Sequence, residues 1–390
     1  MASSSKAVTI DDLRRLALRR LPKFVSQPLE TGSGRGEGPA RNVAGFADLR
    51  FLPRTLSGHH TPNLSTPLFG KQYDQPFGIT PIGYADYYRR NADLELAQAA
   101  REANIPFVLS GGSIACLEAI RKIAPQQTWF QLYGARDPAI TRDIVRRAQN
   151  AGIEVLVLTV DIPVSPKNDW LTRRGIKLPA HVPARQLPFV AWQLLSHPRW
   201  TRDLIAAGGF PTMESWRQYA GARANAPQIY TYYRSQVPCP LSWRDVESLR
   251  NLWGGKLIVK GVLRGEDAVR ALDLGADAVT VSNHGGNLLD CLPSSLEMLP
   301  TVREAVGDRI PVFFDGGIRR GVDILAAYCL GASFCFIGRA ALYGAIVGGR
   351  SGIARAIQIL SGELAQTLAM LGVADMTDAS PDLIHRSSVP

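Results

Sequence analysis

Short apolar runs rich in β-forming residues recur along the chain, and each of them ends in a polar or glycine-containing turn. The runs are apolar on both faces, which is typical of buried parallel strands. The pattern therefore predicts eight strands, at residues 76–82, 106–111, 128–133, 155–161, 256–262, 278–283, 311–317 and 334–339.

Helical patterns separate these strands. Asp137 and Pro138 are a typical N-cap and first helical residue, and apolar residues follow them at helical spacing. Three helices are expected to end in the left-handed conformation at Gly152, Gly275 and Gly331, directly before a strand. This alternation predicts a (β/α)8 TIM barrel of the α/β class rather than a doubly wound sheet.

Two segments fall outside the repeating units. Residues 1–75 contain a basic amphipathic helix and a glycine-rich stretch at 31–42, and we expect them to pack on a barrel formed by residues 76–390. Residues 162–240 are far longer than a usual connection between a strand and the next helix. Because barrel active sites lie on the loops after the strands, this insertion is expected to be a lid, a specificity segment or a docking segment.

The insertion includes an apolar stretch with interspersed arginines at 187–210. Such a stretch can form a helix that lies in a membrane interface. We favour the alternative that its aromatic residues pack over the barrel mouth, because apolar helical faces usually belong to a core. The residues concerned are Phe189, Val190, Trp192, Leu194, Leu195 and Trp200.

The composition is that of an ordinary globular protein, with 46% hydrophobic and 20% charged residues, and it excludes a disordered or collagen-like chain. The formal charge is +10, but the basic residues are dispersed and accompany no nucleic-acid motif, so no nucleic-acid partner is expected. The five scattered cysteines form no C-x-x-C pair, which indicates reduced thiols in a cytoplasmic protein without a metal site.

Polar residues stand at the C-terminal ends of the expected strands, where the active sites of barrels lie. Any one of them could merely cap a strand, but the whole set predicts a binding site, because buried polar groups are costly unless they are used. The set comprises Ser110, Gln131, Tyr133, Thr159, Asp161, Lys260, Ser282, Asn283, His284 and Asp315.

Three features of these strand ends suggest specific chemistry. Lys260 lies inside an apolar strand. Three interpretations are open: a core lysine paired with a carboxylate, a Schiff-base lysine of an aldolase, or a cation that faces an anionic cofactor. His284 precedes two glycines at a tight turn and is a candidate base, with Asp161 available to orient it. The last two strands end in glycines followed by Arg319 and Arg339, which is the common phosphate site of barrels.

Taken together and in this order, the motifs resemble those of the FMN-dependent α-hydroxy acid oxidases and dehydrogenases. The resemblance extends over about residues 10–385 and implies a homo-oligomeric oxidoreductase whose barrel holds FMN without a covalent bond. The stretches that carry it are FQLY (130–133), LTVD (158–161), VKG (259–261), VSNHGG (281–286), FDGGIRRG (314–321) and FIGR (336–339).

The same resemblance implies a role for each matching residue. His284 would be the base, Asp161 would orient it, Tyr133 would hydrogen-bond the reacting atom of the substrate, and Lys260 would stabilise reduced flavin. The residues implied to bind FMN are Pro81, Ile82, Gly83, Ser110, Gln131, Thr159, Lys260, Ser282, Asp315, Gly316, Gly317, Arg319, Gly338 and Arg339.

The chain departs from the family at the substrate carboxylate. Asn168 and Asn287 stand where the family has two arginines, and Pro28 stands where it has a tyrosine. This pattern is similar to that of pre-mycofactocin synthase-like members, whose substrate carries no free carboxylate. We therefore expect an enzyme that dehydrogenates a carbon bearing O–H or N–H beside a carbonyl, without a free carboxylate, with Tyr133, Asn168, His284 and Asn287 binding the substrate.

Several alternatives remain open at this point. The chain could be an ordinary hydroxy acid oxidase or dehydrogenase of the lactate or mandelate type, with a carboxylate clamp relocated to Lys167, Arg173 or Arg174. It could also be a Schiff-base aldolase that uses Lys260, or a degenerate barrel without turnover. The electron acceptor could be O2, a quinone or another protein.

Overall fold

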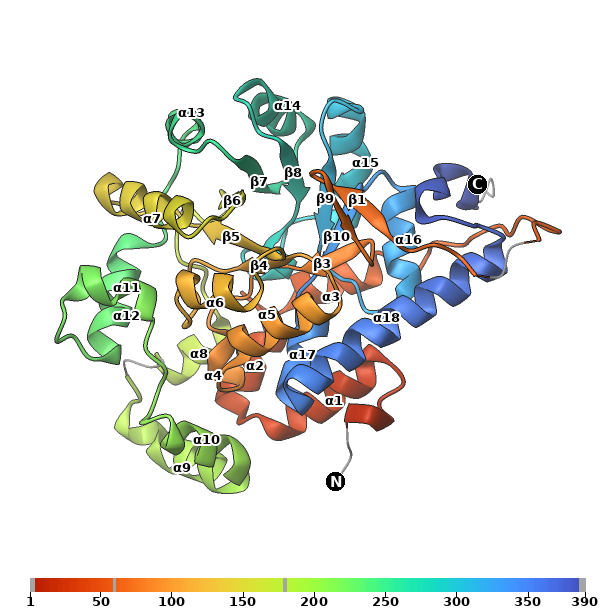
Figure 1. Ribbon diagram of the computed structural model, residues 1–390. Coiled ribbons are helices and arrows are strands. Elements are labelled where there is room, and N and C mark those ends of the chain that lie inside the picture. The colour runs from red at the N-terminus through yellow and green to blue at the C-terminus, as the bar shows by residue number, and fades with distance from the viewer. Residues whose placement is uncertain (1–3, 59–60, 178–180, 386–390) are drawn as a thin grey trace.

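A closed barrel of parallel strands forms the centre of the computed structural model, which describes residues 4–58, 61–177 and 181–385 (Figure 1). The order around the barrel is β10-β3-β4-β5-β6-β7-β8-β9. These strands are β3 (Phe77–Ile79), β4 (Phe107–Leu109), β5 (Thr128–Leu132), β6 (Val155–Thr159), β7 (Lys256–Val262), β8 (Ala278–Val281), β9 (Val312–Asp315) and β10 (Phe334–Ile337). Each strand lies within one of the eight expected runs, so the barrel prediction is confirmed.

Helices surround the barrel and connect its strands. Asp137 accepts a hydrogen bond from the Ala139 amide as an N-cap, and Gly152, Gly275 and Gly331 all have positive φ angles, as expected. The helices are α4 (Ala85–Tyr88), α5 (Ala92–Glu102), α6 (Leu117–Ile123), α7 (Pro138–Asn150), α13 (Trp243–Leu252), α14 (Gly265–Asp273), α15 (Ser295–Val306), α16 (Gly321–Cys329), α17 (Arg339–Gly348) and α18 (Arg350–Leu371).

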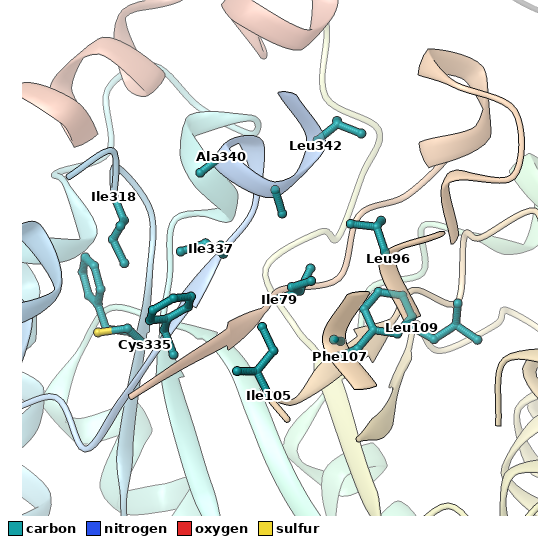
Figure 2. Packing of buried hydrophobic residues seen from close by; sticks show 14 of the residues in the cluster. Ile79, Leu96, Ile105, Phe107, Leu109, Ile318, Cys335, Ile337, Ala340 and Leu342 are labelled. Atoms are coloured by element: carbon teal, nitrogen blue, oxygen red, sulfur yellow. The ribbon is translucent and has the colours of Figure 1, made fainter. Parts of the chain in front are cut away.

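The strands separate two apolar layers because successive side chains point to opposite faces. On β5, Trp129 belongs to the cluster inside the barrel, whereas Phe130 belongs to the larger cluster between the barrel and its helices. Figure 2 shows part of the outer layer, with Ile79 and Ile337 on the paired strands β3 and β10 and Leu342 on helix α17. Both layers consist of buried apolar side chains, so the barrel is a packed core, with polar residues gathered at the C-terminal ends of its strands.

The N-terminal extension consists of α1 (Ile10–Arg20), α2 (Lys23–Thr31), α3 (Glu37–Ala44) and an antiparallel hairpin of β1 (Thr66–Leu68) and β2 (Lys71–Tyr73). The hairpin was not expected from the sequence. Its Phe69 packs against Trp129 and Phe313 inside the barrel, each at 5.9 Å between ring centroids. The hairpin thereby closes the end of the barrel that lies opposite the polar strand ends.

The insertion between β6 and α13 is helical. It contains α8 (Asp169–Arg174), α9 (Leu187–Ser196), α10 (Pro198–Ala206), α11 (Glu214–Ala220) and α12 (Ala226–Gln236), and α9 and α10 extend away from the barrel in Figure 1. Short 3-10 helices complete the described chain at Ser4–Lys6, Ala184–Gln186, His284–Gly286, Met376–Asp378 and Pro381–Leu383. Within the described residues, no helix combines the length and the apolar character needed to cross a membrane.

The expectation that the aromatic residues of this insertion are packed is right only in part. Phe189 contacts Trp170, and Trp200 contacts Phe24 of α2 at 5.7 Å. Trp192 of α9, in contrast, is 66% exposed, so the described part of the chain leaves most of its side chain uncovered. The packed aromatics fix the insertion to the N-terminal extension, and the exposed ones form a surface.

The glycine-rich stretch at 31–42 docks on the turn that carries His284. Asp290 accepts hydrogen bonds from the amides of Gly36 and Gly38 at 3.1 and 3.2 Å. Gly286 approaches this stretch so closely that a Cβ atom at Gly286 would lie 2.3 Å from the nitrogen of Pro39. The packing of α3 on the turn therefore requires a residue without a side chain.

We predict that Gly286→Ala lowers the free energy of unfolding by about 2–5 kcal/mol, because it adds a steric clash to the strain of a positive φ angle. Gly208→Ala is the matched control, since Gly208 has φ +76° against +78° for Gly286 and has open space where a Cβ would lie. The control should lose only about 1–2 kcal/mol. Equal losses in urea unfolding of the two variants would contradict the packing argument.

Candidate active site

The polar strand ends form the uppermost layer of the barrel interior. A residue two positions after an inward-facing one points to the same side of a strand. Five of the expected residues follow the inward-facing Val108, Trp129, Val157, Ile258 and Phe313 at this spacing, and they are Ser110, Gln131, Thr159, Lys260 and Asp315. The alternation that builds the apolar barrel core therefore also gathers these polar side chains at its open end.

Lys260 carries a buried ammonium group at this end of the barrel. Its Nζ lies 3.1 Å from Asp315 Oδ2 and donates to Ser282 Oγ at 2.9 Å, and the Lys260 and Asp315 side chains are 5% and 6% exposed. Thr80 also donates to Asp315 Oδ2. Lys260 is thus paired with a carboxylate, and because it lines the pocket it also supplies positive charge there.

His284 lies at the edge of the same pocket in a left-handed conformation, with φ +58°. Its Nδ1 is 3.1 Å from Asp161 Oδ1, and its amide donates to Ser282 Oγ at 3.0 Å. Burial would raise the pKa of Asp161, but the charge and hydrogen bond of His284 and the charge of Lys260 outweigh it, and the pKa is lowered. Asp161 therefore remains ionised and keeps His284 Nε2 free for the pocket.

Asn42 stabilises the turn that carries His284 through hydrogen bonds. The side chains of Asn42 and Asn283 exchange two hydrogen bonds of 2.7 and 2.8 Å, and Asn283 Oδ1 also accepts from the Gly286 amide. The Asn283 amide donates to Ser295 Oγ at 3.0 Å. Sequence reasoning missed Asn42, because its partner is 241 residues away and no local pattern marks it.

Three buried polar atoms around the pocket have no hydrogen-bond partner within the described chain. They are Gln131 Nε2, Thr159 Oγ1 and Asp315 Oδ1. Gln131 Oε1, in contrast, accepts from Ser110 Oγ and the Gly111 amide, each at 3.1 Å. Because such orphaned groups are costly, their gathering at one site indicates a polar ligand. A flavin ring and its ribityl chain offer the complementary donors and acceptors, so these residues fit FMN.

The pocket wall combines most of the expected cofactor residues. It is lined by Pro81, Ile82, Gly83, Tyr133, Thr159, Lys260, His284, Asn287, Asp315, Gly316, Gly317, Arg319, Gly338 and Arg339. Gly317 has φ +85°, and a Cβ there would lie 2.1 Å from the Asn42 carbonyl oxygen. This glycine is therefore required by the packing of α3 on the loop after β9, in addition to any contact with a phosphate.

The two arginines at the phosphate end are engaged differently. Arg339 donates to the carbonyls of Leu29 and Gly285 and to Asn287 Oδ1, at 2.7 to 2.9 Å. The guanidinium of Arg319 donates to the Ile318 carbonyl and lies in the same pocket. Burial lowers the pKa of Arg339, and the charge of Arg319 lowers it further, which is the electrostatic environment expected of a site for an anion.

Tyr133 forms the opposite wall beside helix α12. Burial raises its pKa well above the ordinary value, the neighbouring Tyr233 and Asp161 raise it further, and the positive charge of Arg234 opposes them. The Tyr133 phenol is therefore protonated and able to donate a hydrogen bond. Arg234, which sequence reasoning did not single out, donates to Ser165 in the loop after β6.

The structure separates the two asparagines that were expected to bind substrate. Asn287 lines the pocket, where its Nδ2 donates to the His284 carbonyl at 2.8 Å. Asn168 lies outside the pocket lining: its Oδ1 caps α8 at the Leu171 amide, and its Nδ2 donates to Thr31 and to the Gly32 carbonyl. Asn168 Oδ1 thus caps α8 and its Nδ2 attaches the insertion to the N-terminal extension, so the expected contact of Asn168 with substrate gains no support from this geometry and stays a prediction.

The cations expected for a relocated clamp also face elsewhere. Lys167 and Arg173 lie 3.4 and 3.6 Å from the carboxylate of Asp169. Arg174 stacks on Trp170, with its guanidinium carbon 3.9 Å from the ring centroid. None of the three lines the pocket that contains His284.

Residues 17–386 match the FMN-dependent dehydrogenase family. The L-lactate dehydrogenase of Caulobacter vibrioides (strain NA1000 / CB15N) is 33% identical to this chain over 373 residues, or 96% of either protein. The crystal structure of (S)-mandelate dehydrogenase, a monotopic membrane protein, gives a TM-score of 0.91 at 34% identity and covers 97% of this chain and 99% of that one. A mandelate oxidase with an arginine-to-leucine substitution, crystallised with 2-hydroxy-phenylacetamide, gives 0.79 at 28% identity and covers 97% and 98%.

We predict that Arg319→Ala weakens FMN binding by about 10- to 150-fold, since a charge-assisted contact with phosphate contributes about 1.5–3 kcal/mol. The adjacent Arg320→Ala is the matched control, because the Arg320 guanidinium pairs with Glu363 at 2.9 Å outside the pocket. Fluorescence titration of the apoproteins with FMN measures both constants. Equal affinities for the two variants would place the phosphate elsewhere.

Proposed function

Because the chain belongs to the FMN-dependent dehydrogenase family, we propose that it oxidises 2-hydroxy acids of the lactate or mandelate type to 2-oxo acids. The observation that carries this proposal is the His284–Asp161 pair at the edge of a pocket whose buried polar atoms lack partners. The named relatives act on such acids, and their similarity extends over nearly the whole chain. The similarity to these relatives favours a hydroxy acid as substrate, which was the alternative interpretation of the sequence, over the expected substrate without a free carboxylate.

FMN, when bound, accepts the two electrons and the hydrogen that leave carbon 2 of the substrate. Gln131, Thr159 and Asp315 would use their unpartnered atoms to hold it, and Arg319 would bind its phosphate. Lys260 contributes a fixed positive charge to a pocket that must take up electrons. Because Lys260 is paired with Asp315 and serves this role, the aldolase alternative has no support.

His284 takes the hydroxyl proton of the substrate. Its Nδ1–H points to Asp161, which leaves the lone pair of Nε2 for the substrate. The ionised Asp161 also stabilises the imidazolium that forms when the proton arrives. Tyr133 keeps its own proton because its pKa is raised, and it donates a hydrogen bond to the substrate oxygen.

Recognition of a carboxylate must differ from that implied by the family pattern, because neither Asn168 nor Asn287 carries a charge. Arg234 of α12 is the cation that opposes the raised pKa of Tyr133. Among the described residues no ion pair joins Arg234 to a carboxylate, and its guanidinium donates a hydrogen bond to Ser165 Oγ. We propose Arg234 as the counter-charge of the substrate carboxylate: it does not itself line the pocket, but its charge acts on Tyr133, which does.

A neutral substrate is the second candidate. Asn287 supports it, because a carboxamide at the pocket wall can donate to a carbonyl oxygen and accept from an amide N–H. The mandelate oxidase that lacks one arginine was crystallised with a neutral 2-hydroxy amide. The two candidates differ only in the charge of the group next to the reacting carbon, so matched acids and amides distinguish them.

A peripheral contact of the insertion with a membrane also belongs to this proposal. Leu187, Trp192, Leu195 and Ile205 on α9 and α10 are between 55% and 77% exposed, which is unusual for large apolar side chains so close together. The mandelate dehydrogenase relative is a monotopic membrane protein. These observations reverse our sequence-based preference for a fully packed insertion.

We predict that His284→Asn retains FMN but slows reduction of the flavin by substrate by at least about 10²–10⁴-fold, the usual contribution of a general base. Anaerobic stopped-flow mixing with L-lactate or L-mandelate, monitored by flavin absorbance, measures the rate. His385→Asn, at a histidine outside the pocket lining, is the control and should react as the unmodified protein does. An unchanged rate in His284→Asn would contradict the assignment of the base.

We predict that Arg234→Gln raises the apparent Kd for L-mandelate by about 10- to 150-fold, through loss of one charge-assisted contact, and leaves that for 2-hydroxy-phenylacetamide unchanged. Arg223→Gln, at an exposed arginine of the same insertion, is the charge-matched control. Reduction by the amide alone in the unmodified protein would support the neutral substrate. Reduction by the acid with no effect of Arg234→Gln would disprove only the role of Arg234.

A further inference from the structure

A second cavity, of about 160 Å³, lies between the insertion and the N-terminal extension. Its wall combines the end of α1, the segment after α4, and helix α10. Tyr88 lines both this cavity and the pocket that contains His284, so the two lie next to each other. The cavity has no part in the chemistry proposed above.

Arginines dominate the wall of this cavity. Five arginines and two aspartates line the cavity, so the formal charge of its lining is +3. The arginines are Arg20, Arg89, Arg90, Arg199 and Arg202, and the aspartates are Asp86 and Asp203. Even when Glu95, which pairs with Arg89 at 2.7 Å, is included, the excess remains +2.

The carboxylates at the cavity are too few or too exposed to neutralise this charge. Asp86 already accepts from the backbone amides of Asn91 and Asp93 at 3.1 and 3.2 Å. Asp203 forms a 3.4 Å pair with Arg202 at the surface, and such pairs stabilise little. Like-charged groups gathered around one concavity are expected where an anion binds.

The pKa of Arg20 also indicates that positive charges are concentrated at this cavity. Burial lowers the pKa of the Arg20 guanidinium, and the charges of Arg199 and Arg89 lower it further. Arg20 is held in place by the carbonyls of Ile346 and Val347 at the C-terminal part of α17. Three elements that are distant in sequence thus place guanidiniums around one volume: Arg20 and Arg89 are half-buried, and Arg90, Arg199 and Arg202 are exposed at its rim.

The remaining lining limits the kind of anion. Guanidinium groups approaching from several sides match the oxygens of a tetrahedral phosphate better than those of a planar carboxylate. The volume is below the range of about 300–1,000 Å³ of pockets for drug-sized ligands, so it suits a headgroup rather than a nucleotide. Trp200, Leu204 and Pro211 add an apolar side to the cavity.

We propose that this arginine-lined cavity binds the phosphate group of a small phosphate ester, either the headgroup of an anionic phospholipid or a soluble ester. A lipid would enter from the side of α10, whose neighbouring surface carries the exposed Leu195 and Ile205. The site is distinct from the FMN phosphate site at Arg319, and it does not depend on which substrate the enzyme oxidises.

The test uses the FMN-loaded protein, so that the phosphate site at Arg319 is filled. The first arm measures co-sedimentation with phosphatidylcholine vesicles, with and without phosphatidylglycerol. The second arm measures binding of glycerol 1-phosphate by calorimetry. The double variant Arg199→Gln/Arg202→Gln removes two charges from the cavity, and Arg142→Gln/Arg146→Gln on the exposed side of α7 removes two charges elsewhere.

We expect the cavity variant to weaken binding by about tenfold or more in at least one arm, and the α7 variant to leave it unchanged. Dependence in the vesicle arm alone identifies a lipid headgroup, and dependence in both arms identifies the phosphate ester itself. Equal losses for the two double variants would show general attraction between opposite charges and overturn the site. If the unmodified, FMN-loaded protein binds in neither arm, the proposal is also overturned. FMN content and melting temperature are measured for each variant to show that it is folded and loaded.

Discussion

The buried ammonium group of Lys260 is the constraint on which the active site depends. A charge that is 5% exposed at the end of an apolar strand must be compensated, and Asp315 and Ser282 provide this compensation within 3.1 Å. Ser282 also accepts from the His284 amide, so the partner of the lysine positions the histidine. The positive charge of Lys260 and the position of His284 are therefore fixed by one connected set of hydrogen bonds.

The N-terminal extension completes this arrangement, although it lies outside the barrel. Asn42 holds the turn through Asn283, and Asp290 attaches the glycine-rich stretch to the same loop. Gly286 and Gly317 allow α3 to approach to a distance at which any side chain would clash. The geometry of the base is thus a property of tertiary contacts between the two ends of the sequence, and the barrel alone does not produce it.

The sequence was sufficient to predict the features that repeat locally. Every barrel strand and the polar layer above the core follow from hydrophobic runs and the two-residue period of a strand. The hairpin that contains Phe69, the lock at Asn42 and the charge at Arg234 could not be predicted, because each depends on partners far away in the chain. The role of Asn168 as the N-cap of α8 was not predicted either, because its place in the motif suggested a substrate contact instead.

In the proposed assignment the counter-charge of the substrate lies on the insertion, because Asn168 and Asn287 stand where the family has arginines. Helix α12 is packed firmly, since Tyr233 contacts Trp216 at 4.8 Å and Tyr84 at 6.2 Å between ring centroids. A cation on this helix is therefore as well positioned as one on a barrel loop. Lys260 lies on β7 and His284 on the turn after β8, whereas Arg234 lies on α12, so a change of charge on this helix leaves the hydrogen bonds of Lys260 and His284 in place. This separation explains how one barrel keeps its cofactor chemistry while its substrate contacts and its outer surface diverge.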